Sequence, residues 1–466
     1  MTNSIGEISE CKTIFLIGAN PTEAHPVIGA KMRQALNKGA KLIVADPRRT
    51  DFAAKADVWL QLKPGTDVAL LNGMMNIIIT NGWHDERFIA DNTQGFEKMA
   101  AAVAVYTPQA VVEITGVPYD KLEAAAKIYA CGEPAAIFYT LGITEHTTGT
   151  DNVMTLANLA MLTGNIGKPS SGVNPLRGQN NVQGACDCGA LPNVYPGYQK
   201  VDVAANHEKF SRAWGRELSD KVGLMIPQMF DGAISGDVKA MYIMGEDPVI
   251  SDANARHVIK ALKSLDFLVV QNLFLTETAK LADVVLPAAS FAEKDGTFTN
   301  TERRIQRVRK AITPIGGSRP DGEIIQEISR RMGYEMPGDT AEEVMAEMAS
   351  LTPSYGGVTY ARLEEKGLQW PVPNAEHPGT PFLHGDGRFT SGKGQFMVTR
   401  YQPPAELPDD DYPLLLTTGR ILYHYNASTQ PYSKRLTKFR PQERMMISPS
   451  DADRQGINEG DELRVI

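Results

Sequence analysis

The amino-acid sequence predicts an α/β protein with two related parallel-sheet halves and the beginning of a β-barrel at its C-terminal end. Three observations support this prediction. Short apolar runs alternate with amphipathic stretches, and this alternation recurs as an internal repeat. After Tyr412, the sequence pattern changes to one of short strands and turns. Alternating strand and helix patterns are typical of βαβ units, and therefore of a parallel sheet.

The first strand–helix series begins near the N-terminus. An apolar run at 13–17 ends in a Gly-Ala-Asn-Pro turn, and an amphipathic stretch follows over 26–37. Further apolar runs cover 41–45 and 58–62, and a helical pattern then continues to about residue 80. We therefore expect three parallel strands with a helix after the first and after the third.

The same order recurs later in the chain, with strands predicted at 240–244 and 267–271. The motif Gly18-x-x-Pro21 aligns with Gly245-x-x-Pro248, and Thr50–Leu60 aligns with Thr276–Leu286 at six of eleven positions. Each copy later reaches a Gly-Thr pair, Gly65-Thr66 and Gly296-Thr297. The repeats, residues 13–70 and 240–297, predict two homologous α/β halves.

These patterns divide the chain into four predicted domains. The first α/β half covers residues 1–170, the second 171–335, a helical and irregular linker with a helix at Asp339–Leu351 covers 336–408, and a partial β-barrel covers 409–466. In the last domain, Pro413–Leu416, Met445–Ile447 and Leu463–Ile466 read as strands, with a short helix after Met445–Ile447. A terminal strand without a partner is an unpaired edge, so we expect the natural protein to continue.

Composition narrows the functional classes. The 466 residues contain 47 basic and 55 acidic side chains, and a net charge of −8 argues against nucleic-acid or anionic-membrane binding. No run of 18 apolar residues and no N-terminal leader pattern is present, so a cytoplasmic protein without membrane insertion is expected. Four cysteines are too few for a disulfide framework; Cys186 and Cys188 are read as small buried thiols, with a metal or redox role as the alternative.

Polar and glycine-rich turns follow the predicted strands. In parallel sheets, ligands bind at the carboxyl ends of the strands, and glycine lets a backbone approach a phosphate. The Gly-x-Gly-x-x-Gly fingerprint that is usual for NAD binding is absent. Each turn, taken alone, could simply end a strand without binding a ligand. Because two halves carry matching turns, we expect two similar nucleotide moieties. The turns are Gly18–Pro21, Asp46–Arg48, Gly65–Asp67, Gly142–Thr144, Gly245–Asp247 and Gln271.

A dense polar segment covers residues 172–189. The guanidinium of Arg177 could bind a carboxylate through two hydrogen bonds, and Gln179 and Asn180 could orient a polar ligand; a surface loop with an exposed arginine is the alternative. A second arginine–histidine segment contains Thr418, Gly419, Arg420 and His424. None of the eight histidines has zinc-site spacing.

The segment Asn174–Asp187, with the sequence Asn-Pro-Leu-Arg-Gly-Gln-Asn-Asn-Val-Gln-Gly-Ala-Cys-Asp, resembles the signature of catalytic subunits of molybdenum- or tungsten-dependent formate dehydrogenases. These enzymes belong to the dimethyl-sulfoxide-reductase family and carry bis-molybdopterin guanine dinucleotide (bis-MGD). The resemblance covers nearly the whole chain. The other family-like segments, in family order, are Gly18–Pro21, Ala45–Arg48, Leu162–Asn165, Met244–Pro248, Ala282–Pro287, Gly296–Asn300 and Thr418–Arg420.

The resemblance implies two α/β domains related by a pseudo-twofold axis, with the cofactor between them and a C-terminal barrel over the pterins. It implies reversible oxidation of formate to CO2, with Arg177 clamping the carboxylate, and electron-transfer partner subunits of the iron–sulfur, flavin/NAD or hydrogenase type. One dinucleotide would contact Gly18, Asn20, Asp46, Arg48, Gly65, Thr66 and Asp67. The other would contact Gly245, Asp247, Gln271 and Asp321, and the pterins would lie near Gly142, Gln179, Thr418, Gly419, Arg420 and His424.

The sequence also departs from the family pattern. The four-cysteine [4Fe–4S] site and the metal-ligating cysteine or selenocysteine followed by histidine are expected upstream of Met1, so no metal ligand is assigned in this chain. Position 322 is glycine where the family tends to have tryptophan. We expect this chain alone not to turn over. A UGA codon read as a stop would explain the start at Met1.

Two alternative functions stay open at the level of sequence. One is another molybdopterin oxidoreductase, such as a nitrate reductase or a formylmethanofuran dehydrogenase subunit. The other is a non-catalytic scaffold like the large subunit of respiratory NADH dehydrogenase. The Arg177 segment argues against the first. The retained turn residues Asp46, Arg48, Asp247 and Gln271 argue against the second, because a scaffold needs none of them.

Overall fold

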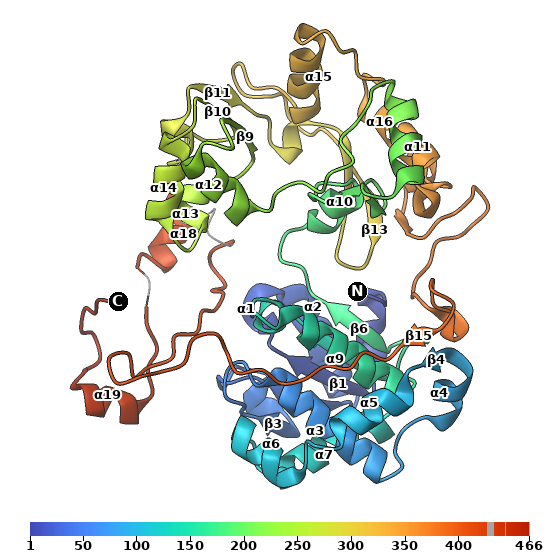
Figure 1. The fold of residues 1–466 in the computed structure, drawn as a ribbon, viewed down its shortest axis with the longest axis vertical. Helices are drawn as coiled ribbons and strands as arrows, with labels where there is room; N and C mark the ends of the chain where they lie inside the picture. The colour runs from blue at the N-terminus through green and yellow to red at the C-terminus, as the bar shows by residue number, and fades with distance from the viewer. Residues whose placement is uncertain (426–432, 443, 466) are drawn as a thin grey trace. The chain divides into compact units, whose positions relative to one another are not determined.

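The computed structural model describes residues 1–425, 433–442 and 444–465 (Figure 1). The chain divides into two compact units, Met1–Thr418 and Gly419–Ile466. None of the described helices is long and apolar enough to cross a membrane. The larger unit contains both sheets of the predicted α/β halves.

The first sheet has five parallel strands in the order β3-β2-β1-β5-β6. Successive side chains of its central strand point to opposite faces. Phe15 and Ile17 enter the core on one face, and Ile14 and Leu16 enter the core on the other. Burial on both faces explains why this strand reads as a continuous apolar run. The strands are β1 (Thr13–Ile17), β2 (Lys41–Ala45), β3 (Val58–Leu60), β5 (Ala135–Tyr139) and β6 (Gly172–Pro175).

Helices cover both faces of this sheet (Figure 1). Residues of α3, α7 and α9 supply the larger core, while η1 and α2 pack against the opposite face. The helices of this lobe are η1 (Ile5–Glu10), α1 (Pro21–Ala24), α2 (Pro26–Asn37), η2 (Ala53–Lys55), α3 (Asp67–Thr80), α4 (Glu86–Asn92), α5 (Phe96–Val103), α6 (Pro108–Thr115), α7 (Tyr119–Cys131), α8 (Leu141–Thr144) and α9 (Gly149–Leu162).

The second sheet has three parallel strands in the order β11-β10-β9. Leu268 and Val270 of its central strand are buried against α12 and α14. The strands are β9 (Ala240–Met244), β10 (Phe267–Asn272) and β11 (Val284–Pro287), and the helices are α12 (Ile226–Ser235), α13 (Pro248–Ser251), α14 (Ala255–Lys263) and η3 (Ala279–Leu281).

The two copies of the repeat share backbone geometry at the first strand end. Gly18 has a positive φ of 55°, and its N–H donates to the carbonyl oxygen of Ala45 at 3.0 Å. Gly245 has a φ of 70°, and its N–H donates to the carbonyl oxygen of Gln271 at 2.9 Å. In each copy, glycine is therefore required because the chain turns through the left-handed region.

A second matching contact links the strands that follow. The Leu42 N–H donates to the Asp57 carboxylate at 2.9 Å, and the Leu268 N–H donates to the Asp283 carboxylate at 2.7 Å. Both aspartates belong to the eleven-residue segment aligned from sequence. The repeated positions therefore keep the same structural role in both halves.

The predicted match between the two Gly-Thr pairs has no structural counterpart. Gly65 and Thr66 precede α3, whereas Gly296 begins β12 (Gly296–Thr299), which pairs with β13 (Arg304–Val308) in an antiparallel sheet. Instead, α15 (Asp321–Arg331) follows the second sheet, and it begins at Asp321 as α3 begins at Asp67. An insertion between β11 and α15 carries the second Gly-Thr pair, so chain order alone misaligned the two sites.

The remainder of the larger unit surrounds the small antiparallel sheet β12-β13-β14. The predicted helix at 339–351 is present as α16. These elements are α10 (Val182–Asp187), β7 (Val194–Tyr195), β8 (Gln199–Lys200), α11 (Ala204–Trp214), η4 (Phe291–Glu293), β12 (Gly296–Thr299), β13 (Arg304–Val308), α15 (Asp321–Arg331), α16 (Ala341–Leu351), η5 (Pro353–Tyr355), α17 (Tyr360–Leu363), β14 (Leu368–Gln369) and η6 (Gly385–Gly387).

An extended segment at 394–404, called the strap here, returns to the first lobe and crosses it (Figure 1, orange). Its strand β15 (Gly394–Gln395) pairs with β4 (Thr93–Gln94), and Phe396 enters the first core. Asn158 of α9 bonds to both backbone groups of Met397, with its Nδ2 2.7 Å from the carbonyl oxygen and its Oδ1 3.0 Å from the N–H nitrogen. The strap is thus part of the first lobe.

The smaller unit contains the helices α18 (Lys434–Phe439) and α19 (Pro449–Gln455). The short helix predicted after Met445–Ile447 is therefore present. The described residues at Pro413–Leu416, Met445–Ile447 and Leu463–Val465 form no strand, and Ile466 lies outside the described residues. A strand needs a neighbour to bond its N–H and C=O groups, and these segments have no paired neighbour among the described residues. The predicted barrel strands were wrong on this point.

Candidate functional site

Four strand ends of the first sheet meet at one edge, and two glycines lie against each other there. A Cβ atom on Gly18 would lie 2.7 Å from the carbonyl carbon of Gly142, and a Cβ on Gly142 would lie 2.6 Å from the Gly18 oxygen. The same oxygen accepts hydrogen bonds from the Gly142 N–H at 3.2 Å and the Thr140 hydroxyl at 2.9 Å. Only glycine fits at both positions, and the pair keeps the edge free of side chains.

Two buried carboxyl groups lie at this edge. Asp46 and Asp67 are 7% and 5% exposed, and Asp46 Oδ1 accepts the Arg48 N–H at 2.8 Å. Burial raises the pKa of Asp46. Burial raises the pKa of Asp67 to about 6, against the lowering effect of the His146 charge and with a smaller raising effect of Asp46. These mutual effects place the three groups close together.

His146 was not identified from sequence. Its Nε2 lies 3.0 Å from the carbonyl oxygen of Gly142, four residues earlier. A histidine one turn after a strand-end glycine is too common to stand out alone. Its electrostatic contact with Asp67 adds it to the candidate site.

The other predicted residues of the first half lie in the same turns. Asn20 Oδ1 is buried and finds no hydrogen-bond partner among the residues that the structure describes. The Thr66 hydroxyl donates to the carbonyl oxygen of Lys63 at 2.6 Å, so the threonine also stabilises its own turn. Gly65 has a φ of 79°, and a Cβ there would lie 2.4 Å from Pro404 of the strap. Arg48 is half-buried.

In the second half, the predicted site residues take part in two separate groups of hydrogen bonds. Gln271 is fully buried, and its Nε2 donates to Asp321 Oδ1 at 2.6 Å. Asp247 Oδ1 accepts from both the N–H and the hydroxyl of Thr278, at 3.0 and 2.6 Å. Gly245 lies two residues before Asp247 and has open space where a Cβ would stand.

Two further side chains join the Gln271–Asp321 pair. Tyr242 donates its hydroxyl to Gln271 Oε1, and Lys294 forms an ion pair with Asp321. Burial, followed by the negative charge of Asp321, raises the pKa of Tyr242. Neither Tyr242 nor Lys294 was identified from sequence, because Tyr242 lies inside a strand and Lys294 in the insertion.

Arg177 lies immediately after β6, and its backbone is held on both sides. Its N–H donates to Thr301 Oγ1 at 3.2 Å, and its carbonyl oxygen lies 2.9 Å from His25 Nε2. The guanidinium Nη1 lies 3.7 Å from Cys186 Sγ. The Nε atom is buried with no hydrogen-bond partner among the described residues, which leaves a donor for a ligand. Gln179, two residues on, is exposed.

The residues at 418–424 lie at the junction of the two units. His424 is buried, and its Nε2 lies 3.1 Å from the carbonyl oxygen of Arg440 within the smaller unit. Thr418 and Gly419 are exposed, as is Arg420. Their contact with the pterins stays a prediction.

The four cysteines differ in exposure. Cys11 is buried, Cys186 is half-buried against Arg177, and Cys131 and Cys188 are exposed, so the prediction that Cys186 and Cys188 are both buried was wrong. Desolvation of the sulfur atoms raises the pKa of Cys11 to about 12 and that of Cys188 to about 11, so both thiols are protonated near neutral pH. All four cysteines are free. Among the described residues, no group of three His, Cys, Asp or Glu side chains could hold a metal ion.

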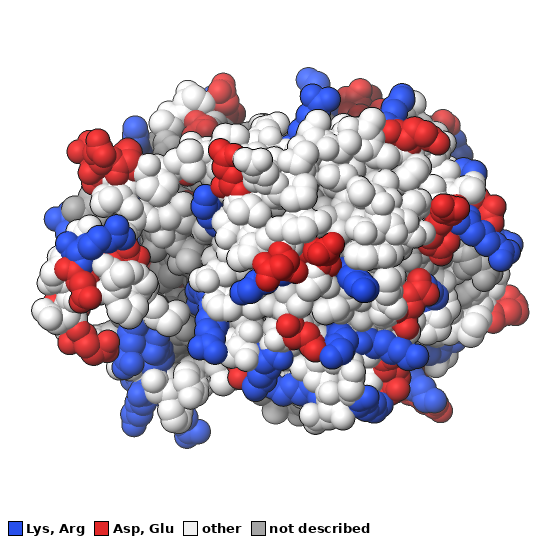
Figure 2. Space-filling model, turned by 90° about the horizontal axis from the view of Figure 1, so that it is seen from below, with Lys and Arg blue, Asp and Glu red and all other residues white. Residues whose placement is uncertain are grey.

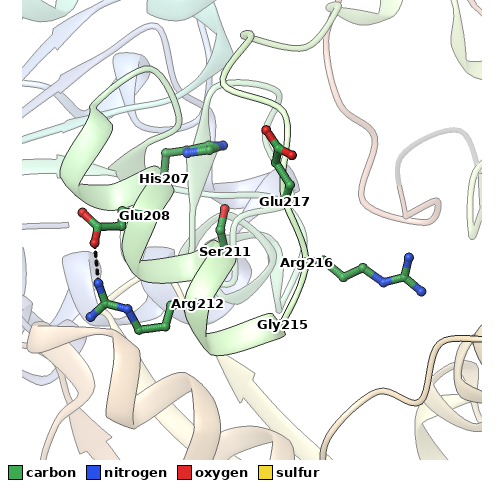
Figure 3. A pocket seen from close by; sticks show the side chains of 7 residues that line it. All are labelled: His207, Glu208, Ser211, Arg212, Gly215, Arg216 and Glu217. Atoms are coloured by element: carbon green, nitrogen blue, oxygen red, sulfur yellow. Dashed lines mark hydrogen bonds and ion pairs between the residues drawn. The ribbon is translucent and has the colours of Figure 1, made fainter.

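A hollow of about 450 Å³ is lined by none of these residues (Figure 3). It is lined by the second half of α11 and the loop after it, and includes the Glu208–Arg212 ion pair. None of the predicted site residues lines it. On the face drawn in Figure 2, acidic and basic side chains are interspersed around a broad uncharged area.

Comparison with known proteins identifies families that match most of this chain. Residues 1–331 match the family described as molybdopterin oxidoreductase, and residues 414–466 match the molydopterin dinucleotide binding domain.

Among curated proteins, the F420-dependent formate dehydrogenase subunit alpha of Methanocaldococcus jannaschii is 49% identical over all of this chain and 69% of its own length. Formate dehydrogenase H of Escherichia coli is 43% identical over 92% of this chain and 60% of its own length.

Among solved structures, acetylene hydratase of Pelobacter acetylenicus superposes with a TM-score of 0.75 at 22% identity, covering 98% of this chain and 69% of that chain. At this identity, the likeness shows the fold alone. The repeated strand-end turns and the sequence matches agree: this chain belongs to the molybdopterin oxidoreductase family.

Proposed function

We propose that this chain is part of the catalytic subunit of a formate dehydrogenase that reversibly oxidises formate to CO2 at a molybdenum or tungsten bis-MGD centre. The observation that carries the proposal is Arg177. Its guanidinium lies in a segment that resembles the formate dehydrogenase signature, and its buried Nε lacks a partner among the described residues. Relatives named as formate dehydrogenases support the same activity. No comparison favours the scaffold alternative or another molybdopterin oxidoreductase.

The residues present fit a bound dinucleotide. The Gly18–Gly142 contact leaves a strand edge without side chains. The buried Asn20 Oδ1 accepts no hydrogen bond from the described residues, so it could accept one from a ligand. Buried carboxylates, such as that of Asp46, suit the N–H groups of a guanine or the hydroxyls of a ribose. Two homologous halves with matching turns suit two guanine dinucleotides.

We assign the two dinucleotides to the two halves. The first contacts Gly18, Asn20, Asp46, Arg48, Gly65, Thr66 and Asp67, and the second contacts Gly245, Asp247, Gln271 and Asp321. Gly142, Gln179, Thr418, Gly419, Arg420 and His424 lie near the pterins. The proposed domains are residues 1–170, 171–335, 336–408 and 409–466, although β6 pairs with β5 of the first sheet.

In this proposal, Arg177 binds the substrate carboxylate and thereby aims the formate C–H bond. When bound, the metal centre supplies the acceptor for the electron pair of that bond. Thr301 and His25 fix the backbone on either side of Arg177. A planar guanidinium with two parallel donors sets both the position and the tilt of a carboxylate, which a lysine cannot do.

The remaining parts of the enzyme are also proposals. We infer that the metal ligand, cysteine or selenocysteine, and the [4Fe–4S] cluster are supplied by sequence outside this chain. The relatives from Methanocaldococcus jannaschii and Methanococcus maripaludis are named as alpha subunits, which supports partner subunits for electron transfer. Those relatives are named F420-dependent. We propose a cytoplasmic location.

Substitution of Arg177 tests the proposal. The chain is expressed with its natural flanking sequence and partner subunits, and formate-dependent reduction of a viologen dye is measured together with pterin content. Arg177→Lys is expected to lower kcat/KM for formate by roughly 10²-fold while pterin content is kept. The control is Arg309→Lys, since Arg309 is an exposed partner of Glu364. Wild-type kcat/KM in Arg177→Lys, or no formate oxidation by the wild type, would contradict it.

A further inference from the structure

A buried carboxylate lies at the end of the helix that follows the Arg177 segment. Asp187, the last residue of α10, is 1% exposed. Its Oδ1 accepts hydrogen bonds from Gln183 Nε2 at 2.7 Å and Tyr198 Oη at 2.9 Å. Its Oδ2 accepts from Tyr355 Oη at 2.6 Å and Trp370 Nε1 at 2.7 Å. Four donors offset the cost of removing this charge from water.

Three of the four donors come from other segments of the chain. Gln183 belongs to α10 itself, Tyr198 to the loop between β7 and β8, Tyr355 to η5, and Trp370 follows β14. The carboxylate therefore fixes the last turn of α10 against three other segments. Its backbone joins them, since the Asp187 carbonyl oxygen accepts the Gly197 N–H at 2.7 Å.

The last turn of α10 also carries the neighbour of the arginine. Cys186, adjacent to Asp187, places its sulfur 3.7 Å from Arg177 Nη1. The other end of α10 is held by Asn181, whose Oδ1 accepts the Thr299 N–H at 2.8 Å. The surface against which the guanidinium rests is thus fixed at both ends, and Asp187 supplies the fixation nearest to Arg177.

We propose that Asp187 is a positioning residue for substrate binding. It holds the last turn of α10, and with it Cys186, so that the Arg177 guanidinium keeps the orientation that binds a small carboxylate. This inference rests on the proposed role of Arg177, but it concerns a residue that never meets the substrate. Losing the carboxylate should weaken substrate binding more than turnover.

The test is Asp187→Asn in the holoenzyme. The amide keeps one acceptor oxygen but turns an N–H2 group toward two of the four donors. We expect the KM for formate to rise about tenfold, with kcat changed by less than about threefold and pterin content unchanged. Trp370→Phe removes a single donor and should raise the KM by a smaller factor. The matched control is Glu347→Gln, since Glu347 also accepts an indole N–H, from Trp214 at 2.8 Å, but belongs to α16 rather than α10.

Crystal structures of the variants provide a readout that does not depend on formate. In the Asp187→Asn structure, the Arg177 guanidinium should have moved away from the Cys186 sulfur. An unmoved guanidinium with an unchanged KM would overturn the positioning role. A displaced guanidinium with an unchanged KM would support positioning and instead contradict the carboxylate-binding role of Arg177. An equal rise in KM for Glu347→Gln would show general loosening and would also overturn the inference.

Discussion

Asp67, the first residue of α3, lies within electrostatic reach of His146, beyond β5 in the chain. Burial raises the pKa of the Asp67 carboxyl to about 6, and the charge of His146 acts to lower it. The two groups come from turns that follow different strands. Their meeting follows from the parallel order of the sheet, which gathers carboxyl ends of strands at one edge.

The buried Asp67 should make the cofactor-free chain less stable at neutral pH. Its folded pKa lies above the unfolded value of 3.8, so the folded state binds more protons between pH 4 and 6 and loses stability as pH rises through that window. Asp67→Asn should raise the free energy of unfolding at pH 7 by roughly 2 to 3 kcal/mol, with no gain below about pH 4. Thermal unfolding across pH measures this.

Asp57 provides a control of opposite sign. Burial acts to raise its pKa, but the Lys41 ammonium and the Leu42 N–H together hold the pKa below its usual value. Its stabilising contribution is present above the unfolded pKa and is lost as pH falls through the folded pKa. Asp57→Asn should therefore lower the melting temperature at pH 7. If the two substitutions changed the stability at pH 7 in the same direction, the opposite pKa shifts of Asp67 and Asp57 would be refuted.

The Gly18–Gly142 contact should tolerate no side chain. Gly18→Ala adds both a strained positive φ and a backbone collision, and should cost about 3 kcal/mol or more of stability and abolish dinucleotide retention. Gly39→Ala separates the two effects, because Gly39 has a φ of 95° but nothing within 4 Å of a Cβ. It should cost about 1 kcal/mol. Stability is measured by chemical denaturation, and bound dinucleotide by the nucleotide released on heating. Similar losses of stability in both variants would argue against the close approach of Gly18 and Gly142.

Gln271→Glu should make the second half sensitive to pH. The new carboxyl would face Asp321, and the like charges would raise its pKa, so the variant should be destabilised at pH 8 and recover as pH falls. We expect reduced guanine dinucleotide content at pH 8. Gln306→Glu on the exposed side of β13 is the control. A variant with wild-type stability across pH 5 to 8 would exclude the proposed pairing.

The attachment of the strap to the first lobe should depend on Asn158. Asn158→Ala would remove both hydrogen bonds to the backbone of Met397, at a cost of about 1 to 3 kcal/mol. Limited proteolysis should then cleave between residues 394 and 404. Asn76→Ala is the milder control, because half-buried Asn76 donates one hydrogen bond, to the Tyr106 carbonyl oxygen at 3.0 Å. Resistance of the Asn158 variant to proteolysis would show that the strap is held by other contacts.

Sequence reasoning succeeded where structure is local. The run Thr13–Ile17 fixed a strand buried on both faces, and the turn after it is where the structure places the Gly18–Gly142 contact. The repeat predicted equivalent positions for Asp57 and Asp283 because both stabilise the strand beside them. The Asp57 and Asp283 contacts each join residues only 15 positions apart, which a pattern can show, whereas the pairing of Gly18 with the distant Gly142 came from the structure.

Contacts between distant segments were missed. Nothing in the sequence around Asp187 indicates that Tyr355 and Trp370 donate to it, because those partners depend on how separate segments pack. The insertion hid the equivalence of Asp67 and Asp321 at two helix starts. The predicted barrel strands were read from side-chain pattern, whereas a strand also requires a paired neighbour.

The strap has a consequence for biosynthesis. Phe396 completes a core whose other members end near Val173, so the ribosome must add roughly two hundred further residues before that core can close. At about 5 to 20 residues per second, this delay lasts about ten to forty seconds. During that interval, the surface of the nascent chain that Asn158 and its neighbours present to the strap stays exposed to solvent. A chaperone or the dinucleotide therefore has time to reach the lobe before the strap covers this surface.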